Sequence, residues 1–253
     1  MKTIVLSSAF ALAFFGCLAA DKVQPPKLSP EKIAEFNAKN GGFVDPPSDI
    51  RKLVVLDGRV KDLSQLTNHL HAVETRLGLG AEVRKFTCTE STDVLKEAFA
   101  AKAKGAGAVI VLYERPNVPV MATYPEDGIS LVNVLPLQDV EYTPYRWRLV
   151  KEFWRGIAFA IGGYGTFMPT PTCLQAVFSK ADLDNVKTWS LTPQQIIAVA
   201  ACKGKLKLYN PKPVPYSRAC REGWAPAPTN AVQRSLYQRL QDPTSRFKSD
   251  FSK

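Results

Sequence analysis

Histidine, the side chain most often used as a general base, is scarce in this sequence. The sequence contains two histidines, His69 and His71. Two residues apart on a helix, they point about 200° away from each other, so the pair cannot bind one metal ion. No GxSxG segment accompanies them, which argues against a serine hydrolase with a nucleophile elbow. The two histidines are therefore expected at partly exposed surface positions.

The five cysteines lie far apart in the sequence, at Cys17, Cys88, Cys173, Cys202 and Cys220. In an oxidising compartment the last four allow two disulfides in three connectivities. The preferred pairing joins Cys202 to Cys220, which are nearest in sequence, and leaves Cys88 with Cys173 if these two lie close in space. Because no CxxC occurs, the spacing does not indicate a zinc ribbon.

Aromatic residues gather around the end of the longest predicted helix, where a substrate cleft is expected. Trp154, Tyr164 and Trp189 are candidates for holding a peptide or a sugar ring. The same side chains also suit a hydrophobic core, and this alternative stays open. Gly162 to Gly165 (GGYG) follows the helix, whereas phosphate-binding loops precede helices, so we interpret this segment as a helix end.

The N-terminal residues 1–20 have the parts of a signal peptide in their usual order. Lys2 precedes an apolar run from Ile4 to Phe15, and small residues follow before Asp21. These 12 apolar residues rise about 18 Å as a helix, too short for the roughly 30 Å hydrocarbon core of a bilayer. The sequence therefore predicts an exported protein, periplasmic or extracellular, whose mature chain has no transmembrane segment.

Two processing routes of this signal are open. Cleavage after the small residues would release a soluble chain. Alternatively, Phe14 to Cys17 loosely resembles a lipobox, in which Cys17 is lipidated and anchors the chain to the envelope. Phe14 departs from that pattern, because such motifs usually carry Leu at this position.

Downstream of the signal, strand and helix patterns alternate in the manner of an α/β domain. Strands are expected over 52–56, 81–87, 108–113, 119–123 and 129–135, and helices over 63–77, 92–104, 143–161, 192–201 and 230–241. This order predicts a mixed sheet with flanking helices over residues 51–201. A linker over 21–50 with one short helix, opened by Ser29-Pro30, precedes this domain.

The longest predicted helix carries an apolar stripe that includes Leu149 and Phe153, so one side of it is expected to be buried. Arg148 and Glu152 lie four residues apart on this helix. We expect them to form an ion pair on its outer side.

Positive charge is concentrated in the Pro-rich C-terminal extension, residues 202–253. Residues 203–253 hold eleven Lys or Arg and three Asp or Glu, a net charge of +8 out of +10 for the chain. A basic extension can contact an anionic envelope surface or polysaccharide, or it can keep the protein soluble. Export makes nucleic acid the least expected partner.

The order of elements resembles that of the zincin-type metalloproteases, and the local pattern resembles archaemetzincins. In that family an edge strand precedes a helix that carries HExxHxxGxxH, and a later loop contains a cysteine and a Met-turn. Residues 128–134 resemble the strand, 149–154 resemble the start of the helix, and Cys173 resembles the cysteine of the loop.

The resemblance places the zinc motif on residues that are not zinc ligands. Arg155 and Phe159 stand at the first two histidines, Gly156 at the catalytic glutamate and Gly165 at the third histidine, and only Gly162 matches the motif's glycine. Zinc needs imidazole, thiolate or carboxylate ligands, and hydrolysis needs a carboxylate base. The resemblance therefore implies a relative of these metalloproteases that has lost hydrolytic activity and holds neither zinc nor another cofactor.

The leading hypothesis is an exported, non-catalytic binding protein. Its cleft would take a peptide, a glycan or an envelope component, with Arg155 available to accept a carboxylate. One alternative is an active metallopeptidase or another hydrolase with an unrecognised site, which a cluster of ionisable groups in the cleft would favour. A second alternative is a lipid-anchored structural protein of the envelope, held by Cys17.

Overall fold

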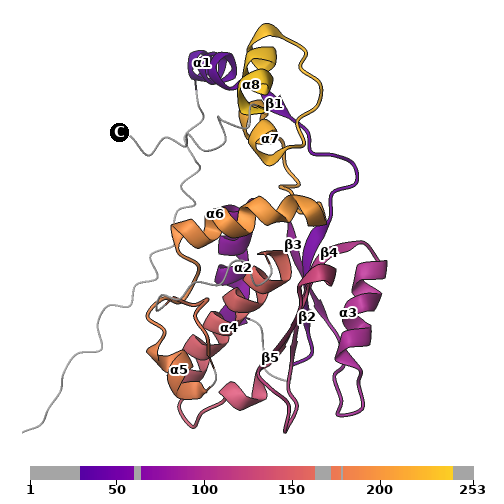
Figure 1. Cartoon of the computed structure of the whole chain (residues 1–253), viewed down its shortest axis with the longest axis vertical. Helices are drawn as coiled ribbons and strands as arrows, with labels where there is room; N and C mark the ends of the chain where they lie inside the picture. Colours follow the sequence, from indigo (N-terminus) through magenta and orange to yellow (C-terminus); the bar gives the residue numbers. More distant parts are fainter. Residues whose placement is uncertain (1–28, 60–63, 163–171, 178, 242–253) are drawn as a thin grey trace, which may run out of the picture.

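A five-stranded sheet with helices on both faces forms the body of the protein (Figure 1). The computed structural model describes residues 29–59, 64–162, 172–177 and 179–241. The expected signal segment, with Cys17, lies outside the described residues, so export and lipidation stay predictions. No helix in the described part of the chain has the length and apolar character needed to cross a bilayer.

The sheet has the strand order β3-β2-β4-β6-β5. Its strands are β2 (Lys52–Asp57), β3 (Ala81–Lys85), β4 (Ala106–Tyr113), β5 (Met121–Tyr124) and β6 (Ile129–Asn133). The first four strands in this order are parallel, whereas β5 is antiparallel to β6. The predicted α/β fold with a mixed sheet is confirmed.

The central strand is the most apolar one, as expected for a strand covered on both faces. Every residue of β4 is buried. Leu53 and Val55 of β2 face the same core as Ile110 of β4, and their neighbours Val54 and Leu56 face a second core on the opposite side. Alternating side chains of the parallel strands therefore serve two separate cores.

Three helices form these cores with the sheet: α2 (Ser64–Leu77), α3 (Val94–Ala103) and α4 (Tyr142–Gly162). The side chains of α3 belong to one core, and those of α2 and α4 to the other, larger one, so the helices lie on opposite faces of the sheet (Figure 1). The predicted helix end at Gly162 is where α4 ends.

Gly156 lets α4 lie close to the sheet. A Cβ atom at this position would be 3.2 Å from Val132 Cγ2 and 3.6 Å from Ile110 Cγ2. The first separation is tighter than an ordinary van der Waals contact, so a larger side chain would press on β6. The glycine thus has a packing role between helix and sheet.

Two shorter helices complete the larger core, α5 (Lys180–Asn185) and α6 (Pro193–Cys202). Thr192 and Gln195 form a reciprocal capping box at the start of α6, and Pro193 occupies its first turn. The predicted helix start at Thr192 is confirmed by this geometry.

The segments expected to be a linker and an extension pack against each other (Figure 1). This terminal unit consists of α1 (Pro30–Asn40), β1 (Phe43–Val44), β7 (Val214–Pro215), α7 (Tyr216–Glu222) and α8 (Ala231–Gln241). Strand β1 pairs antiparallel with β7, and α1 contacts α8. A small core that includes Tyr216, Cys220 and Leu236 holds the unit together.

A buried lysine connects the terminal unit to the α/β body. Lys203 Nζ donates to the carbonyl oxygens of Leu77 and Gly78 at the end of α2, at 2.9 and 2.8 Å. The same ammonium lies 2.9 Å from Glu222 Oε1 on α7. Its charge is thus neutralised inside the protein, so this part of the basic extension is not a solvated surface.

The predicted disulfides are not formed, because the four described cysteines are free. Cys88 packs against the core beneath α3, whereas Cys173 is buried in the core on the opposite face of the sheet. Cys202 packs on the larger core, and Cys220 lies in the core of the terminal unit. A disulfide needs Cα atoms about 4.4–6.8 Å apart, and separation into different cores prevents this approach.

Candidate functional site

A cleft of about 820 Å³ runs between strand β5, helix α4 and the residues 175–177 and 179–183. Its lining is mostly apolar. The lining residues are Val118, Pro119, Val120, Met121, Ala122, Thr123, Pro136, Leu137, Glu152, Arg155, Phe159, Gln175, Ala176, Val177, Ser179, Lys180 and Leu183. An apolar cleft with a few polar groups is the usual form of a ligand-binding site.

Strand β5, at the edge of the sheet, forms one wall of this cleft. Asn133 N donates to Val120 O at 2.7 Å, and Met121 is opposite Val132. Hydrogen-bonded and non-hydrogen-bonded residue pairs alternate along an antiparallel ladder. Ala122 therefore forms backbone hydrogen bonds with β6, whereas the backbone N–H and C=O of Met121 point away from β6. No described strand pairs with that outer edge.

Helix α4 contributes Glu152, Arg155 and Phe159, whose spacing places them on one face of the helix. Arg155 Nε lies 2.8 Å from Glu152 Oε1. Arg155 Nη1 donates to the carbonyl oxygens of Cys173 and Gln175, at 3.0 and 2.5 Å. The guanidinium therefore holds residues 173–175, where another wall of the cleft begins, against α4.

Both charges of this pair are almost removed from solvent. Glu152 is 1% exposed and Arg155 7%. Burial raises the pKa of the Glu152 carboxyl above its ordinary value, and the Arg155 guanidinium opposes this shift. With both groups ionised, the floor of the cleft carries no net charge.

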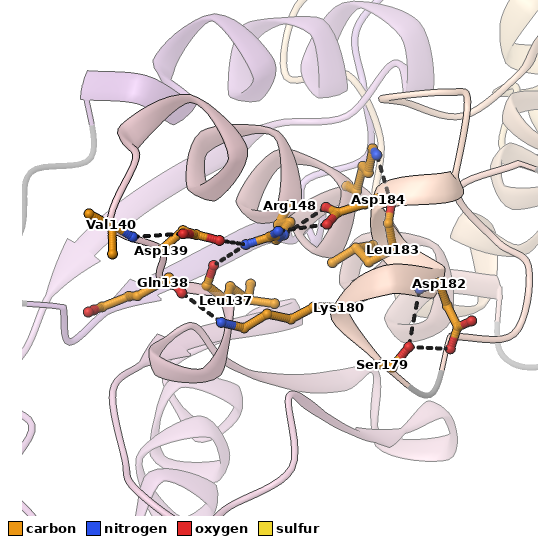
Figure 2. A network of polar contacts seen from close by, with 11 residues as sticks. Leu137, Gln138, Asp139, Val140, Arg148, Ser179, Lys180, Asp182, Leu183 and Asp184 are labelled. Atoms are coloured by element: carbon orange, nitrogen blue, oxygen red, sulfur yellow. Dashed lines mark hydrogen bonds and ion pairs between the residues drawn. The ribbon is translucent and has the colours of Figure 1, made fainter.

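Arg148 holds α5, whose residues Lys180 and Leu183 line the cleft, against α4 (Figure 2). Its Nε and Nη2 atoms donate to Asp184 Oδ1 and Oδ2 at 2.7 and 2.6 Å, and its Nη1 atom donates to Asp139 Oδ2 at 2.8 Å. Hydrogen bonds from Arg148 lower the pKa of both aspartates. Lys151 Nζ adds a 2.7 Å bond to Leu183 O. The parallel pair to Asp184 fixes orientation as well as distance.

A second lysine joins the two sides of the cleft rim. Lys180 Nζ donates to Gln138 O at 2.8 Å, as Figure 2 shows. Beside it, Ser179 caps α5 by accepting from Asp182 N. The contacts of Arg148, Lys151 and Lys180 make α5 a fixed wall.

The structure brings two of the five predicted motif positions into the cleft, Arg155 and Phe159. Gly156 instead faces β6, and Gly162 is the last residue of α4. Gly165 lies outside the described residues.

The aromatic candidates do not gather at the cleft. Trp154 is fully buried, with its Nε1 atom 3.4 Å from His69 Nδ1 on α2, and it does not line the cleft. Trp189 is half exposed and stacks on Trp147 outside the cleft. Tyr164 lies outside the described residues.

The histidines have the positions expected of them. His69 is half-buried and His71 is exposed. Burial and the nearby Arg146 lower the pKa of His69.

The predicted ion pair between Arg148 and Glu152 is wrong. Arg148 bonds to two aspartates outside α4, and Glu152 pairs with Arg155. The helix has no outer side here, because residues 148–161 are all buried. A carboxylate in such an apolar stretch, three residues before an arginine, is the signal that could have identified the pair.

Glu152 also suggests a second register for the zinc motif. It stands three residues before Arg155, the separation of the glutamate and the second histidine in HExxH. In this register Lys151 and Arg155 occupy the first two histidine positions, and Glu152 occupies the glutamate position. The first two ligand positions therefore hold Arg155 and Phe159 in one register and Lys151 and Arg155 in the other, and none of these side chains is a zinc ligand.

These residues do not fit a zinc ion. In the described ranges no three His, Cys, Asp or Glu side chains are grouped closely enough to bind a metal. The cleft side of α4 presents a guanidinium, which repels a dication, and a phenyl ring, which has no donor atom. The only carboxylate on this face is already paired with Arg155.

No protein-family model and no curated protein matches the sequence. The chain is structurally similar to archaemetzincins. For archaemetzincin from Methanopyrus kandleri the identity is 15% and the TM-score 0.43, over 62% of this chain and 97% of that one. For a zinc-dependent peptidase from Methanocorpusculum labreanum the identity is 14% and the TM-score 0.44, over 58% and 99%. Archaemetzincin from Archaeoglobus fulgidus matches at 14% identity and a TM-score of 0.42, again over 58% and 99%. The resemblance predicted from the sequence is thus found as structural similarity at low identity.

Proposed function

We propose that this protein binds an extended peptide in the cleft, as an added strand beside β5, and does not hydrolyse it. The observation that carries the proposal is the position of the outer edge of β5 on the wall of an apolar cleft. Exposed sheet edges bind peptides through main-chain hydrogen bonds, while pockets select alternate side chains.

The dimensions and chemistry of the cleft support a peptide. Residues 118–123 line it without interruption, so a bound strand would have a continuous backbone partner. Val118, Pro136 and Val177 are partly exposed and offer an apolar surface to its side chains. The charges of Glu152 and Arg155 in the floor form an ion pair, so a ligand with a neutral backbone leaves no charge unpaired there.

The groups that face the cleft support binding without hydrolysis. A peptide bond is cleaved by a nucleophile or an activated water together with a group that stabilises the oxyanion. The carboxylate of Glu152 is paired with Arg155, and Arg155 is also bonded to two carbonyl oxygens. Both groups therefore serve the structure of the cleft. If the N-terminal segment is a signal peptide, the partner is a peptide in the periplasm or outside the cell.

Met121→Pro is the test, because proline lacks the backbone N–H that points toward the added strand. This N–H makes no bond to β6, so the substitution leaves the β5–β6 ladder intact. The probe is a peptide selected from a random dodecapeptide library. Loss of the strand bond and the bulk of the ring should weaken binding by about tenfold or more.

Met121→Leu is the matched control, because it keeps the N–H and a similar side-chain volume. Equal affinity of the two variants would refute strand addition. Mass spectrometry of the peptide after incubation with the protein and added zinc tests the second half of the proposal. The peptide should remain intact, and cleavage would establish a peptidase instead.

A further inference from the structure

A stacked pair of tryptophans lies on the surface outside the cleft. The ring centroids of Trp147 and Trp189 are 3.9 Å apart with an angle of 28° between the ring planes. Trp189 is 52% exposed and Trp147 is half-buried. Trp147 is five residues before Glu152 on α4, about 140° around the helix axis, so the pair is separate from the proposed peptide site.

The tryptophan pair is held in place by its neighbours. Thr188 Oγ1 accepts from Cys173 N at 2.9 Å. On the other side of Trp189, Arg76 of α2 donates to Ser190 Oγ and Leu191 O, at 2.9 and 2.6 Å. The ring of Trp189 is therefore presented by an anchored segment, which reduces the entropy lost when a ligand binds.

The charges beside the pair are positive. The guanidinium carbon of Arg146 lies 5.4 Å from the ring centroid of Trp147, and Lys187 is two residues before Trp189. Arg76 completes the set. Within the described residues none of these three cations forms a salt bridge. Arg76 is already bonded to Ser190 and Leu191, so Arg146 and Lys187 are the cations available to an anionic ligand.

The size and surroundings of the pair point to a small, polar ligand. One exposed tryptophan ring is far smaller than the roughly 800 Å² that each partner buries in a stable protein interface. Arg146 lies beside Trp147, and Lys187 and Ser190 are polar sequence neighbours of Trp189, whereas a membrane-inserting surface would be bordered by apolar residues. A sugar ring combines an apolar C–H face, which suits the negative π-face of tryptophan, with polar edges.

We infer that Trp189 and Trp147 form a binding platform for an acidic oligosaccharide. A sugar ring lies on the exposed face of Trp189, and a carboxylate or sulfate elsewhere on the oligosaccharide bonds to Arg146 beside Trp147. This site is independent of the proposed peptide cleft, and neither needs the other to function.

The test measures binding of tetragalacturonate, a heparin tetrasaccharide and neutral cellotetraose to the purified protein by titration calorimetry. At least one acidic probe should bind more tightly than cellotetraose, and its affinity should fall as salt rises. Trp189→Ala should weaken this binding about tenfold or more. Arg146→Gln should abolish the preference for the acidic probe.

Ile197→Ala removes an exposed apolar side chain of α6 that is 58% exposed and should leave the affinity unchanged. Absence of binding by both acidic probes would overturn the inference. So would equal effects of Trp189→Ala and Ile197→Ala. Binding to vesicles of anionic phospholipid that depends on Trp189, without binding of either acidic oligosaccharide, would assign the platform to a membrane surface instead.

Discussion

Arg155 and Glu152 form a buried ion pair one turn apart on α4, with Nε and Oε1 separated by 2.8 Å. The same guanidinium bonds to the carbonyl oxygens of Cys173 and Gln175. The pair therefore links the helix beneath the cleft to the opposite wall. This arrangement also supplies Arg155 with a carboxylate from its own helix, which the sequence-based hypothesis assigned to a ligand.

Arg155→Ala should destabilise the protein by about 3–5 kcal/mol, because it leaves the Glu152 carboxylate buried without a cation. Urea unfolding measures the change. The double variant Glu152→Gln, Arg155→Met removes both charges at similar volume and should cost clearly less than Arg155→Ala alone. A single variant as stable as the wild type would show that the pair does not hold the fold.

Glu152→Gln should change how stability depends on pH. The pKa of Glu152 is raised in the folded protein above its ordinary value of 4.5, so the native state binds this proton more tightly than the unfolded state. The contribution of Glu152 to stability is thus complete below about pH 4.5 and is lost as pH rises through the raised pKa. As pH rises over this range, the free energy of unfolding of the variant should therefore increase relative to that of the wild type.

Unfolding free energies of the wild type and the variant between pH 4 and pH 8 test this pH dependence. The range begins near 4.5, the ordinary pKa of a glutamate. A constant difference between them across the range would contradict the burial of an ionisable carboxyl at this position.

Arg148→Lys should loosen α5 from α4. Lysine keeps the charge but cannot form the two parallel bonds that Arg148 makes to Asp184. We expect a loss of about 1–2 kcal/mol, since hydrogen bonds to charged groups contribute about 1.5–3 kcal/mol and both aspartates are partly exposed. Amide hydrogen exchange should accelerate in α5.

Arg146→Lys on the same helix is the control, because Arg146 is exposed and forms no salt bridge with the described residues. It should change the unfolding free energy by less than about 0.5 kcal/mol. Equal hydrogen-exchange rates of α5 in the two variants would show that Arg148 does not fix this wall.

The purified protein should contain well below one zinc ion per chain. On the cleft side of α4, Arg155 repels a dication, Phe159 has no donor atom, and the Glu152 carboxylate is already paired with Arg155. Elemental mass spectrometry gives the zinc content, and treatment with a chelator should leave the melting temperature unchanged. About one zinc per chain, lost together with stability on chelation, would require a metal site made by other residues.

The order of strands and helices could be predicted from the sequence because it rests on local patterns. The apolar run of β4, the helical stripe of α4 and the Thr192-Pro193 helix start each lie within a few residues of one another. Such patterns reflect backbone geometry and burial that do not depend on distant segments. The mixed sheet followed from this order.

The partners of individual side chains were decided by the tertiary structure. The predicted disulfides failed because Cys88 and Cys173 lie in cores on opposite faces of the sheet. Arg148 and Glu152 did not pair, because α4 is buried on every side over residues 148–161 and each residue has another partner. Strands β1 and β7 pair across most of the chain length.

The sequence by itself therefore determined the α/β order of elements and the absence of histidines from the motif positions on the longest helix. Only the tertiary structure decided that Glu152 and Arg155 lie beneath a cleft, that β5 presents its outer edge there, and that Trp147 and Trp189 stack. The physical reason is the sequence separation over which each kind of interaction acts. Periodicity acts over a few residues, whereas a site forms where side chains from distant segments are packed together.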